Sequence, residues 1–585
     1  MSRRLIYGFA LALLLFPAEV PGVMAADPTQ ANGHQQPRVE KGQVGDPARL
    51  RELREKARSG SLTPEEQKEL DAAMAARNGT RPGTAPMPGA TRPDVPRDPA
   101  EAANRRESYL QRQGESLERM RQIGGEAFKA SEARQAQAGP GRDFYVNNVK
   151  GDDSDDGLAA EKGARGGPVR TLSKGVSLLN PGDTLHLAVT DEPYRETLTL
   201  GDDFGGVPGK PITIDGHGAT ITGSDPLRWD SWNSAGDGLY KSTKFIDELE
   251  EFTDESKLGR VFLVFDGVVQ HMDRSMKGKK AQLKAPGALK PGEWTFEASE
   301  RAFYLRIAGD PAEARVEAPY RRNGVTVRAP KVAATHVIVR NLIVCRVLND
   351  GYNLHGSSRD FLLQNIAALE CGDDGISPHE TNEVEIDGFW SVGNSTGMGN
   401  GYLSKTKARN VRLEGNLGHQ LMTGHMPTTE LTNAIILASP GTEPINITNS
   451  QDTKLVLDNV LIGSPAGQKV SLITKSSTTA RRVTACGPIW EVGGSAQVNQ
   501  CVIAGPVTLL EGGTWSGGDN VFDSATRAPV GDNGSKNDSV GETVLTAMKS
   551  PFAGAGANRA EMQIPAKPKP HPKAGKFISL EAIVE

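Results

Sequence analysis

One short pattern returns three times in the middle of this chain, and its spacing limits what the chain can fold into. Asp350, Asp374 and Asn400 each precede a glycine and a short, largely apolar segment, and they follow one another after 24 and then 26 residues. This period is too short for a strand, a helix and a return strand, which need about 30 residues or more. It suits one rung of a parallel β-solenoid, whose apolar side chains are buried against the neighbouring rungs.

The segments around the pattern support the same fold. Alternating apolar residues set against Asn, Asp or Gly recur at 337–344, 361–369, 384–392, 411–418 and 455–463. The 66 glycines and only 5% aromatic residues also favour short strands joined by turns. We therefore expect an all-β chain folded as a right-handed parallel β-helix. Asn341, Asn365 and Asn459 follow apolar strand residues, which is typical of a structural amide ladder.

The N-terminus predicts export. Arg3 and Arg4 precede an apolar run at 5–16, and small or apolar residues follow at cleavage spacing, so residues 1–25 are expected to be a signal peptide. The run is below the roughly 18 apolar residues that span a bilayer. We expect a secreted protein, periplasmic or at the cell surface, with no transmembrane segment.

Residues 26–141 are poor in apolar side chains and are expected to form a polar tether. Three helical segments are predicted within it, the first at 47–60. The next has Thr63 at its N-cap and Pro64 at its first helical position, and a further, charged helix covers 101–121. The tether would hold a folded body away from a surface.

The folded body is expected to begin near residue 142. Residues 142–257 would hold a capping helix, with apolar spacing over 169–179, and the first rungs of the solenoid. Alternating residues at 258–320 predict a small β-hairpin insertion. The main rungs would occupy 321–530, followed by a Lys- and Pro-rich C-terminal tail at 531–585.

The composition indicates which binding partners and which cysteine chemistry to expect. The net charge of -5 gives no reason to expect nucleic acid binding, and we expect a monomer. Four cysteines are too few and too scattered for a disulfide scaffold, so Cys345 and Cys371 are expected to be buried thiols.

The solenoid turns columns in the sequence into stripes in space, because equivalent positions on adjacent rungs lie about 4.8 Å apart. Asp350, Asp374 and Asn400 would form one stripe. Two neighbouring carboxylates repel, so a purely structural ladder would favour Asn over Asp. The aspartates, with Asp373 and Glu370 nearby, therefore indicate a functional site.

Two further columns accompany the aspartates. His355, His379 and Lys405 stand five residues after the members of the acidic column and would form a second stripe. Tyr352 and Tyr402 would share a third column with an isoleucine, and would offer a sugar-stacking face if they point outward.

At these residues the chain resembles secreted polygalacturonases and related β-helix glycosidases. The succession "NDGYNL", "GDDGIS" and "GNGYLS" is similar to theirs, although this chain has Asn400 where that family has a histidine. The resemblance implies that Asp350 and Asp374 are the acid and base pair and that Asp373 helps to hold the water. It also implies inversion, whereas stacking on adjacent rungs suggests a separation near 5 Å and retention.

The sequence thus predicts an enzyme that cleaves glycosidic bonds of an extracellular polysaccharide without a cofactor. One carboxyl group would protonate the leaving oxygen, and the other would activate water or attack carbon. The predicted catalytic residues are Asp350, Asp373, Asp374, His379 and Lys405. The predicted substrate-binding residues are His355, Glu380, Asn400, Tyr402 and Tyr352.

Two alternatives stay open. Glu370, Asp373 and Asp374 could hold Ca²⁺ against a uronate in a polysaccharide lyase, with Lys405, His379 or Arg409 as the base. Otherwise the chain would be a non-catalytic surface or carbohydrate-binding solenoid, anchored by its tether and basic tail.

Overall fold

The structure is a computed structural model, which forms two compact units, 1–109 and 110–585. The predicted signal peptide and most of the predicted tether lie outside the described residues. The described residues are 56, 63, 66, 99–132, 141–164, 166–245, 258–272, 283–438, 442–448, 453–464, 470–524, 526–538 and 555–583.

In the first unit, the described residues include the predicted helix start. Thr63 Oγ1 accepts a hydrogen bond from the backbone N–H of Glu66 at 3.2 Å, and Glu66 Oε2 accepts from the N–H of Thr63 at 3.1 Å. This reciprocal pair is a capping box, which satisfies two donors that a helix N-terminus leaves open. Lys56 and Thr63 together lower the pKa of Glu66 to about 2. The N-cap prediction at Thr63 is confirmed.

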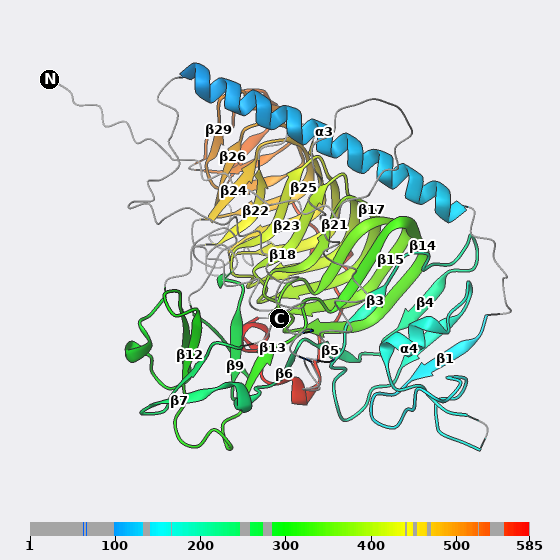
Figure 1. The fold of residues 1–585 in the computed structure, drawn as a ribbon. Helices are drawn as coiled ribbons and strands as arrows, with labels where there is room; N and C mark the ends of the chain where they lie inside the picture. The colour runs from blue at the N-terminus through cyan, green and yellow to red at the C-terminus, as the bar shows by residue number, and fades with distance from the viewer. Residues whose placement is uncertain are drawn as a thin grey trace, which may run out of the picture. The chain divides into compact units, whose positions relative to one another are not determined.

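The second unit is a parallel β-helix, as predicted. Among the described residues, 25 strands belong to one sheet, and every pairing in that sheet is parallel. Figure 1 shows these strands stacked in successive rungs, from green at β14 to orange at β29. In the middle rungs each strand pairs with the next strand but one in sequence, because its partner is the equivalent strand of the following rung. This is the hydrogen-bonding pattern of a solenoid.

Each middle rung contains a short strand and a long, bent strand. The short strands are β16 (Asp374–Pro378), β18 (Thr396–Tyr402), β20 (His419–His425), β22 (Glu443–Thr448) and β24 (Val470–Thr474), each paired with the next. The long strands are β17 (Thr381–Val392), β19 (Lys405–Glu414), β21 (Thr428–Leu437), β23 (Lys454–Gly463) and β25 (Ser477–Cys486). In the two preceding rungs, β14 (Val325–Cys345) and β15 (Tyr352–Leu369) each supply both parts.

The interior is a stack of apolar columns. Tyr352, Ile376, Met398, Leu421 and Ile445 are register partners on five successive rungs, and all five are fully buried. Burying an apolar side chain of this size contributes about 1.5–3 kcal/mol each. The core is therefore continuous along the solenoid axis.

The long strands bend at one residue per rung that has a positive φ. Asn341 (φ 53°), Asn365 (49°), Asn433 (54°) and Asn459 (56°) occupy this left-handed position, which Asn tolerates better than most residues. Asn365 Nδ2 donates to Asn341 Oδ1 at 2.8 Å, and Asn459 Nδ2 donates to Asn433 Oδ1 at 2.7 Å. The predicted amide ladder is confirmed.

The N-terminal end of the solenoid is closed by a short helix. α4 (Leu172–Ser177) follows Thr171, whose Oγ1 accepts from the N–H of Lys174 at 3.1 Å. Leu172 is buried in the main core, so the predicted capping helix is confirmed, at a shorter length than its apolar spacing suggested. β1 (Asp143–Val146), β2 (Thr184–Leu187), β3 (Leu198–Leu200), β4 (Ile212–Asp215) and β5 (Thr220–Thr222) complete the first rungs.

A longer helix, α3 (Pro99–Glu132), covers the predicted charged helix and continues beyond its expected end at Arg121. Gly124 does not end the helix, and at this residue the helix packs closely against the solenoid. A Cβ there would lie 2.3 Å from Thr381 Oγ1. Close packing against β17 therefore outweighs the low helix propensity of glycine.

Two small antiparallel sheets interrupt the rungs (Figure 1). The first contains β6 (Ser224–Pro226), β9 (Phe262–Phe265), β10 (Val268–His271) and β13 (Val316–Pro319), and the second contains β7 (Asn233–Gly236), β8 (Leu239–Ser242), β11 (Glu293–Glu297) and β12 (Ala302–Arg306). Hairpins are present as predicted, and the antiparallel strands begin before residue 258.

The C-terminal segment 555–583 runs back along the solenoid. The N–H of Ala557 donates to Thr484 Oγ1 at 2.8 Å, whereas the N–H of His571 donates to Thr220 Oγ1 at 2.9 Å, many rungs away. The end of the segment meets Arg346, whose NH2 donates to the carbonyl of Lys576 at 2.6 Å. This packing connects the first rungs of the solenoid to rungs far along its axis.

The four cysteines are free and buried, as expected for thiols inside a core. Burial raises the pKa of Cys345 to about 12. None of the helices in the described residues has the length and apolar character that a membrane crossing requires.

Candidate active site

The glycine of the repeated pattern has a structural cause. A Cβ at Gly351 would lie 2.7 Å from the carbonyl oxygen of Gly375, and a Cβ at Gly375 would lie 2.6 Å from the carbonyl oxygen of Gly397. Both distances are shorter than a van der Waals contact, so stacking of the rungs excludes any larger residue. Rung stacking thus explains the glycines but places no such demand on the aspartates before them.

The strand register aligns Asp350 with Asp374 but does not extend to Asn400. Tyr352 pairs with Ile376, which places the two aspartates at the same position on adjacent rungs. The next partner of Asp374 is Thr396. The prediction that Asn400 continues the acidic stripe is wrong, because the rung after Asp374 advances by 22 residues.

Three carboxyl groups meet at the start of these short strands. One carboxylate oxygen from each of Asp350, Asp373 and Asp374 lies within 4.8 Å of the other two. The three residues are only 3%, 5% and 1% exposed, so the predicted pairing of Asp350 and Asp374 forms a buried cluster and not an open surface. Asp350 Oδ2 accepts from Asn353 Nδ2 at 2.6 Å, and Asp350 Oδ1 accepts from the N–H of Asp374 at 3.1 Å.

The other two aspartates have distinct partners. Asp373 Oδ2 forms an ion pair with Arg260 NH1 at 2.8 Å, and Arg260 lies just before β9 of the inserted sheets. Asp374 Oδ2 accepts from Ser377 Oγ at 2.9 Å, and Ser377 Oγ is also 3.1 Å from His379 Nε2. A hydroxyl group therefore links the carboxylate at one end of β16 to the imidazole at the other.

On the next rung, two glycines make room for these side chains. A Cβ at Gly399 would lie 2.3 Å from Asp374 Oδ2, and one at Gly401 would lie 2.9 Å from His379 Cδ2. Asn400, between them, points inward: it is 2% exposed, and its amide contacts the hydroxyls of Thr406 and Thr429 at 3.1 and 2.8 Å. Its predicted substrate-binding role does not fit this orientation.

At the far end of the short strands, ring side chains stack along the solenoid. The ring centroids of His355 and His379 are 4.6 Å apart, and those of His379 and Tyr402 are 5.5 Å apart. Tyr402 and His425 are 4.4 Å apart and nearly parallel, at 6°. All four residues are partly exposed. We call these four residues the ring ladder.

The ring ladder begins beside a charged pair. His355 Nδ1 lies 3.5 Å from Glu380 Oε1. Burial alone would lower the pKa of His355, but the carboxylate of Glu380 outweighs it and raises the pKa above its ordinary value. Burial likewise acts to raise the pKa of Glu380, and the imidazole of His355 outweighs it, so that pKa is lowered. Each of these two side chains therefore favours the charged form of the other.

Two predicted site residues lie elsewhere. Lys405 is the register partner of Glu383 on a long strand, and its Nζ is 2.7 Å from Glu383 Oε1, so it does not continue the histidine column. Tyr352 is fully buried and donates its hydroxyl to the carbonyl of Leu342 at 2.8 Å. It has no surface to offer a sugar.

Glu370, which was predicted to bind Ca²⁺ in a lyase, does not belong to the cluster of aspartates. Its Oε2 lies 2.9 Å from Arg346 NH2, and its Oε1 accepts from Ser579 Oγ at 2.8 Å. Burial raises the pKa of Glu370 despite these partners. In the cluster of possible metal ligands, Asp350 takes the place predicted for Glu370.

Two contributors were missed by the sequence analysis. Arg260 is 90 residues before Asp350, and no pattern connects the two positions. Ser377 could have been found, because it stands three residues after Asp374 as Asn353 stands three residues after Asp350, and each donates to its own aspartate.

No protein-family model and no curated protein matches this chain. Similar solved structures include "The complex structure of XylC with xylose" (TM-score 0.37, 13% identity, 65% of this chain and 74% of that chain). They also include "Glycoside hydrolase" (0.38, 12%, 72% and 99%) and "Rhamnogalacturonan lyase" (0.24, 11%, 68% and 87%). These TM-scores are below 0.5 and say nothing of activity; the strand register itself defines the chain as a parallel β-helix protein.

Proposed function

We propose that this chain is an exported, carbohydrate-active β-helix protein that cleaves glycosidic bonds, with Asp350 and Asp374 as the reacting carboxyl groups. The observation that supports it is their approach within 4.8 Å from adjacent rungs, together with Asp373. Rung stacking requires the neighbouring glycines but does not require acids. A purely structural column would favour neutral amides, as the asparagine ladder of the same solenoid does.

The chemistry divides between the two aspartates. One carboxyl group donates a proton to the leaving oxygen, and the other acts on the sugar or on a water molecule. A proton shared by the pair removes the repulsion of two adjacent negative charges. Their short separation favours the retaining mechanism, in which the second carboxylate attacks carbon directly. Asp373, paired with Arg260, positions its neighbours.

The mechanism requires that a polysaccharide reach the two aspartates. Because Asp350 and Asp374 are buried, a polysaccharide must displace the side chains that cover them. The partly exposed residues His355, His379 and Tyr402 form the nearest ring surface along the same strands. We assign these three residues to contact with the substrate on the surface next to the aspartates.

The test is a reducing-end assay on a panel of plant and algal polysaccharides, with the ultraviolet absorbance of unsaturated uronates followed in parallel. Wild type should release reducing ends without that absorbance. Asp374→Asn and Asp350→Asn should each lower kcat at least 100-fold, because each removes one carboxyl role.

Asp458→Asn is the matched control. Asp458 is also a solenoid aspartate, but it lies between Arg481 and Arg482 on another face and should leave activity unchanged. Full activity in Asp374→Asn, or no cleavage of any polysaccharide by wild type, would contradict the proposal and favour a non-catalytic solenoid.

The lyase is the second candidate, and the three-carboxylate cluster is the observation in its favour. Asp350, Asp373 and Asp374 together offer the oxygen ligands that Ca²⁺ prefers. His379 would then be the base, since Lys405 is paired with Glu383 on another strand. Absorbance of unsaturated products that depends on Ca²⁺ would support this candidate over hydrolysis.

Export and an extracellular polysaccharide partner complete the proposal. Export follows from the predicted signal peptide at 1–25, which amino-terminal sequencing of the mature protein would test, and the polysaccharide partner follows from the proposed role of the aspartate pair. A mature chain that retains Met1 would exclude cleavage of a signal peptide.

A further inference from the structure

Two histidines of the ring ladder and a neighbouring glutamate form a second group of possible metal ligands, different from the three aspartates. His355, His379 and Glu380 each offer one ligand atom, and these atoms lie within 4.8 Å of one another. All three side chains are partly exposed, so small rotations can bring them together around an ion. They come from adjacent rungs, at the turn between the short and long strands.

The backbone and the neighbouring side chains hold these ligands in place. Glu380 Oε2 accepts from the N–H of Gly356 at 3.0 Å, while its Oε1 faces His355 Nδ1 at 3.5 Å. His379 Nε2 lies 3.1 Å from Ser377 Oγ. Metal-binding histidines usually have their second ring nitrogen held by a polar group in this way, which fixes the ring and its tautomer.

The chemistry of the set distinguishes it from the carboxylate cluster. Two imidazoles and one carboxylate are the ligands that Zn²⁺ and neighbouring transition metals prefer, whereas Ca²⁺ prefers oxygen alone. Three protein ligands leave the remaining position for water or a substrate group.

We propose that His355, His379 and Glu380 form a binding site for one transition-metal dication of the Zn²⁺ type. The site does not depend on the proposed glycosidase activity, because its ligands and its readout differ from those of the aspartate pair. It lies at the opposite end of the short strands, connected to Asp374 through Ser377.

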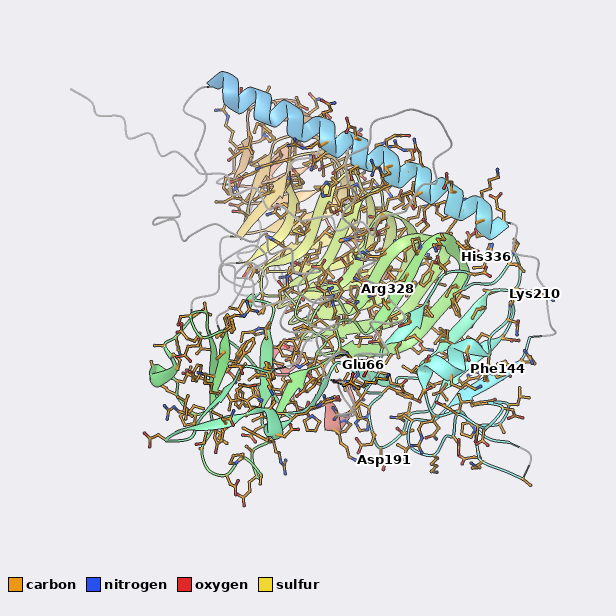
Figure 2. All side chains as sticks on the ribbon, viewed as in Figure 1. Glu66, Phe144, Asp191, Lys210, Arg328 and His336 are labelled. Atoms are coloured by element: carbon orange, nitrogen blue, oxygen red, sulfur yellow. The ribbon has the colours of Figure 1, made fainter. Side chains whose placement is uncertain are left out.

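A charge in the same column opposes the metal and provides a sensitive test. Arg328 is the register partner of His355 on the preceding rung, and it is exposed on β14, where Figure 2 labels it. A positive side chain at the equivalent position of the adjacent rung repels a dication. Arg328→Gln should therefore bind the metal several-fold more tightly than wild type.

The experiment uses the untagged full chain, stripped with a chelator and titrated with Co²⁺ and Zn²⁺. Calorimetry should give one equivalent of metal, and Co²⁺ should develop a visible absorption band that Zn²⁺ abolishes. His379→Gln and Glu380→Gln should each weaken binding at least tenfold, with circular dichroism reporting the fold.

Two variants control for other histidines. His425→Gln removes a ring from the same ladder without removing a proposed ligand, and should bind normally. His186→Gln breaks a second histidine pair, His186 with His217, near the N-terminal rungs, and should also bind normally. Absence of binding by wild type, unchanged binding in Glu380→Gln and His379→Gln, or loss of binding in either control would overturn the proposal.

Discussion

Two columns of polar side chains follow this solenoid, and they differ in charge. At the bends of the long strands, Asn365 donates to Asn341 and Asn341 Nδ2 donates to Asp215 at 2.9 Å, so each neutral amide satisfies its neighbour. Before the short strands, Asp350 and Asp374 place two acids at adjacent positions. The first column stabilises stacking by itself, whereas the second needs protons, cations or basic partners.

The comparison separates structural from functional repetition. Asparagines suit a left-handed bend and a repeating hydrogen bond, so their recurrence follows from the fold. Glycines recur at the start of the short strands because the adjacent rung leaves no space for a side chain. The aspartates recur for neither reason, and this difference makes them the candidate site.

The largest expected effect is steric. Gly375→Ala places a Cβ 2.6 Å from the carbonyl of Gly397, so the rungs must separate, and the free energy of unfolding should fall by about 3 kcal/mol. Denaturant-induced unfolding measures the change. Gly201→Ala is the control, because a Cβ at Gly201 meets nothing within 4 Å. Equal stability of the two variants would show that the glycines are not required by stacking.

Breaking the neutral column should have a smaller effect. Asn365→Ala removes a hydrogen bond and places Ala at a φ of 49°, so the free energy of unfolding should fall by about 2 kcal/mol. The same unfolding assay applies. Asn233→Ala, at an exposed position of β7, should change it by less than about 0.5 kcal/mol. An unchanged free energy of unfolding in Asn365→Ala would show that the amide ladder does not stabilise the protein.

The acidic column should respond in the opposite direction. Asp374→Asn removes one of three carboxyl groups within 4.8 Å of one another and should raise the free energy of unfolding by up to about 1 kcal/mol while activity is lost. Asp458→Asn, whose aspartate is paired with two arginines, should instead lower it. Destabilisation by Asp374→Asn would mean that the cluster is fully compensated in the folded protein.

The smallest expected effect is on the pH dependence of stability, through Asp215 at the end of the amide ladder. Burial acts to raise the pKa of Asp215, but hydrogen bonds from Asn341, His217 and Arg340 lower it below its ordinary value. Its contribution to stability is therefore present above the ordinary pKa and is lost as the pH falls through the lowered one.

Asp215→Asn should accordingly flatten the acid side of a plot of Tm against pH, with little change at neutral pH. Asp360→Asn, an exposed aspartate near His336, gives the reference profile. If Tm fell equally at low pH in Asp215→Asn and in wild type, the loss of stability in acid would come from other carboxyl groups.

The repeat period was sufficient to predict the solenoid, its amide ladder and the pairing of Asp350 with Asp374. It failed at Asn400 and Lys405, because the rung that follows Asp374 is shorter and shifts the register. A solenoid tolerates such changes in its turns, since only the strands must align. The column beyond the second aspartate therefore could not be read from spacing alone.

The sequence by itself determined the rungs, because alternating apolar residues and obligatory glycines are local features that any stacked chain must contain. Only the tertiary structure decided that the aspartates are buried, that Arg260 pairs with Asp373, and that His355, His379 and Glu380 converge. Burial and long-range pairing depend on what packs over a strand. That packing comes from segments whose positions no short-range pattern encodes.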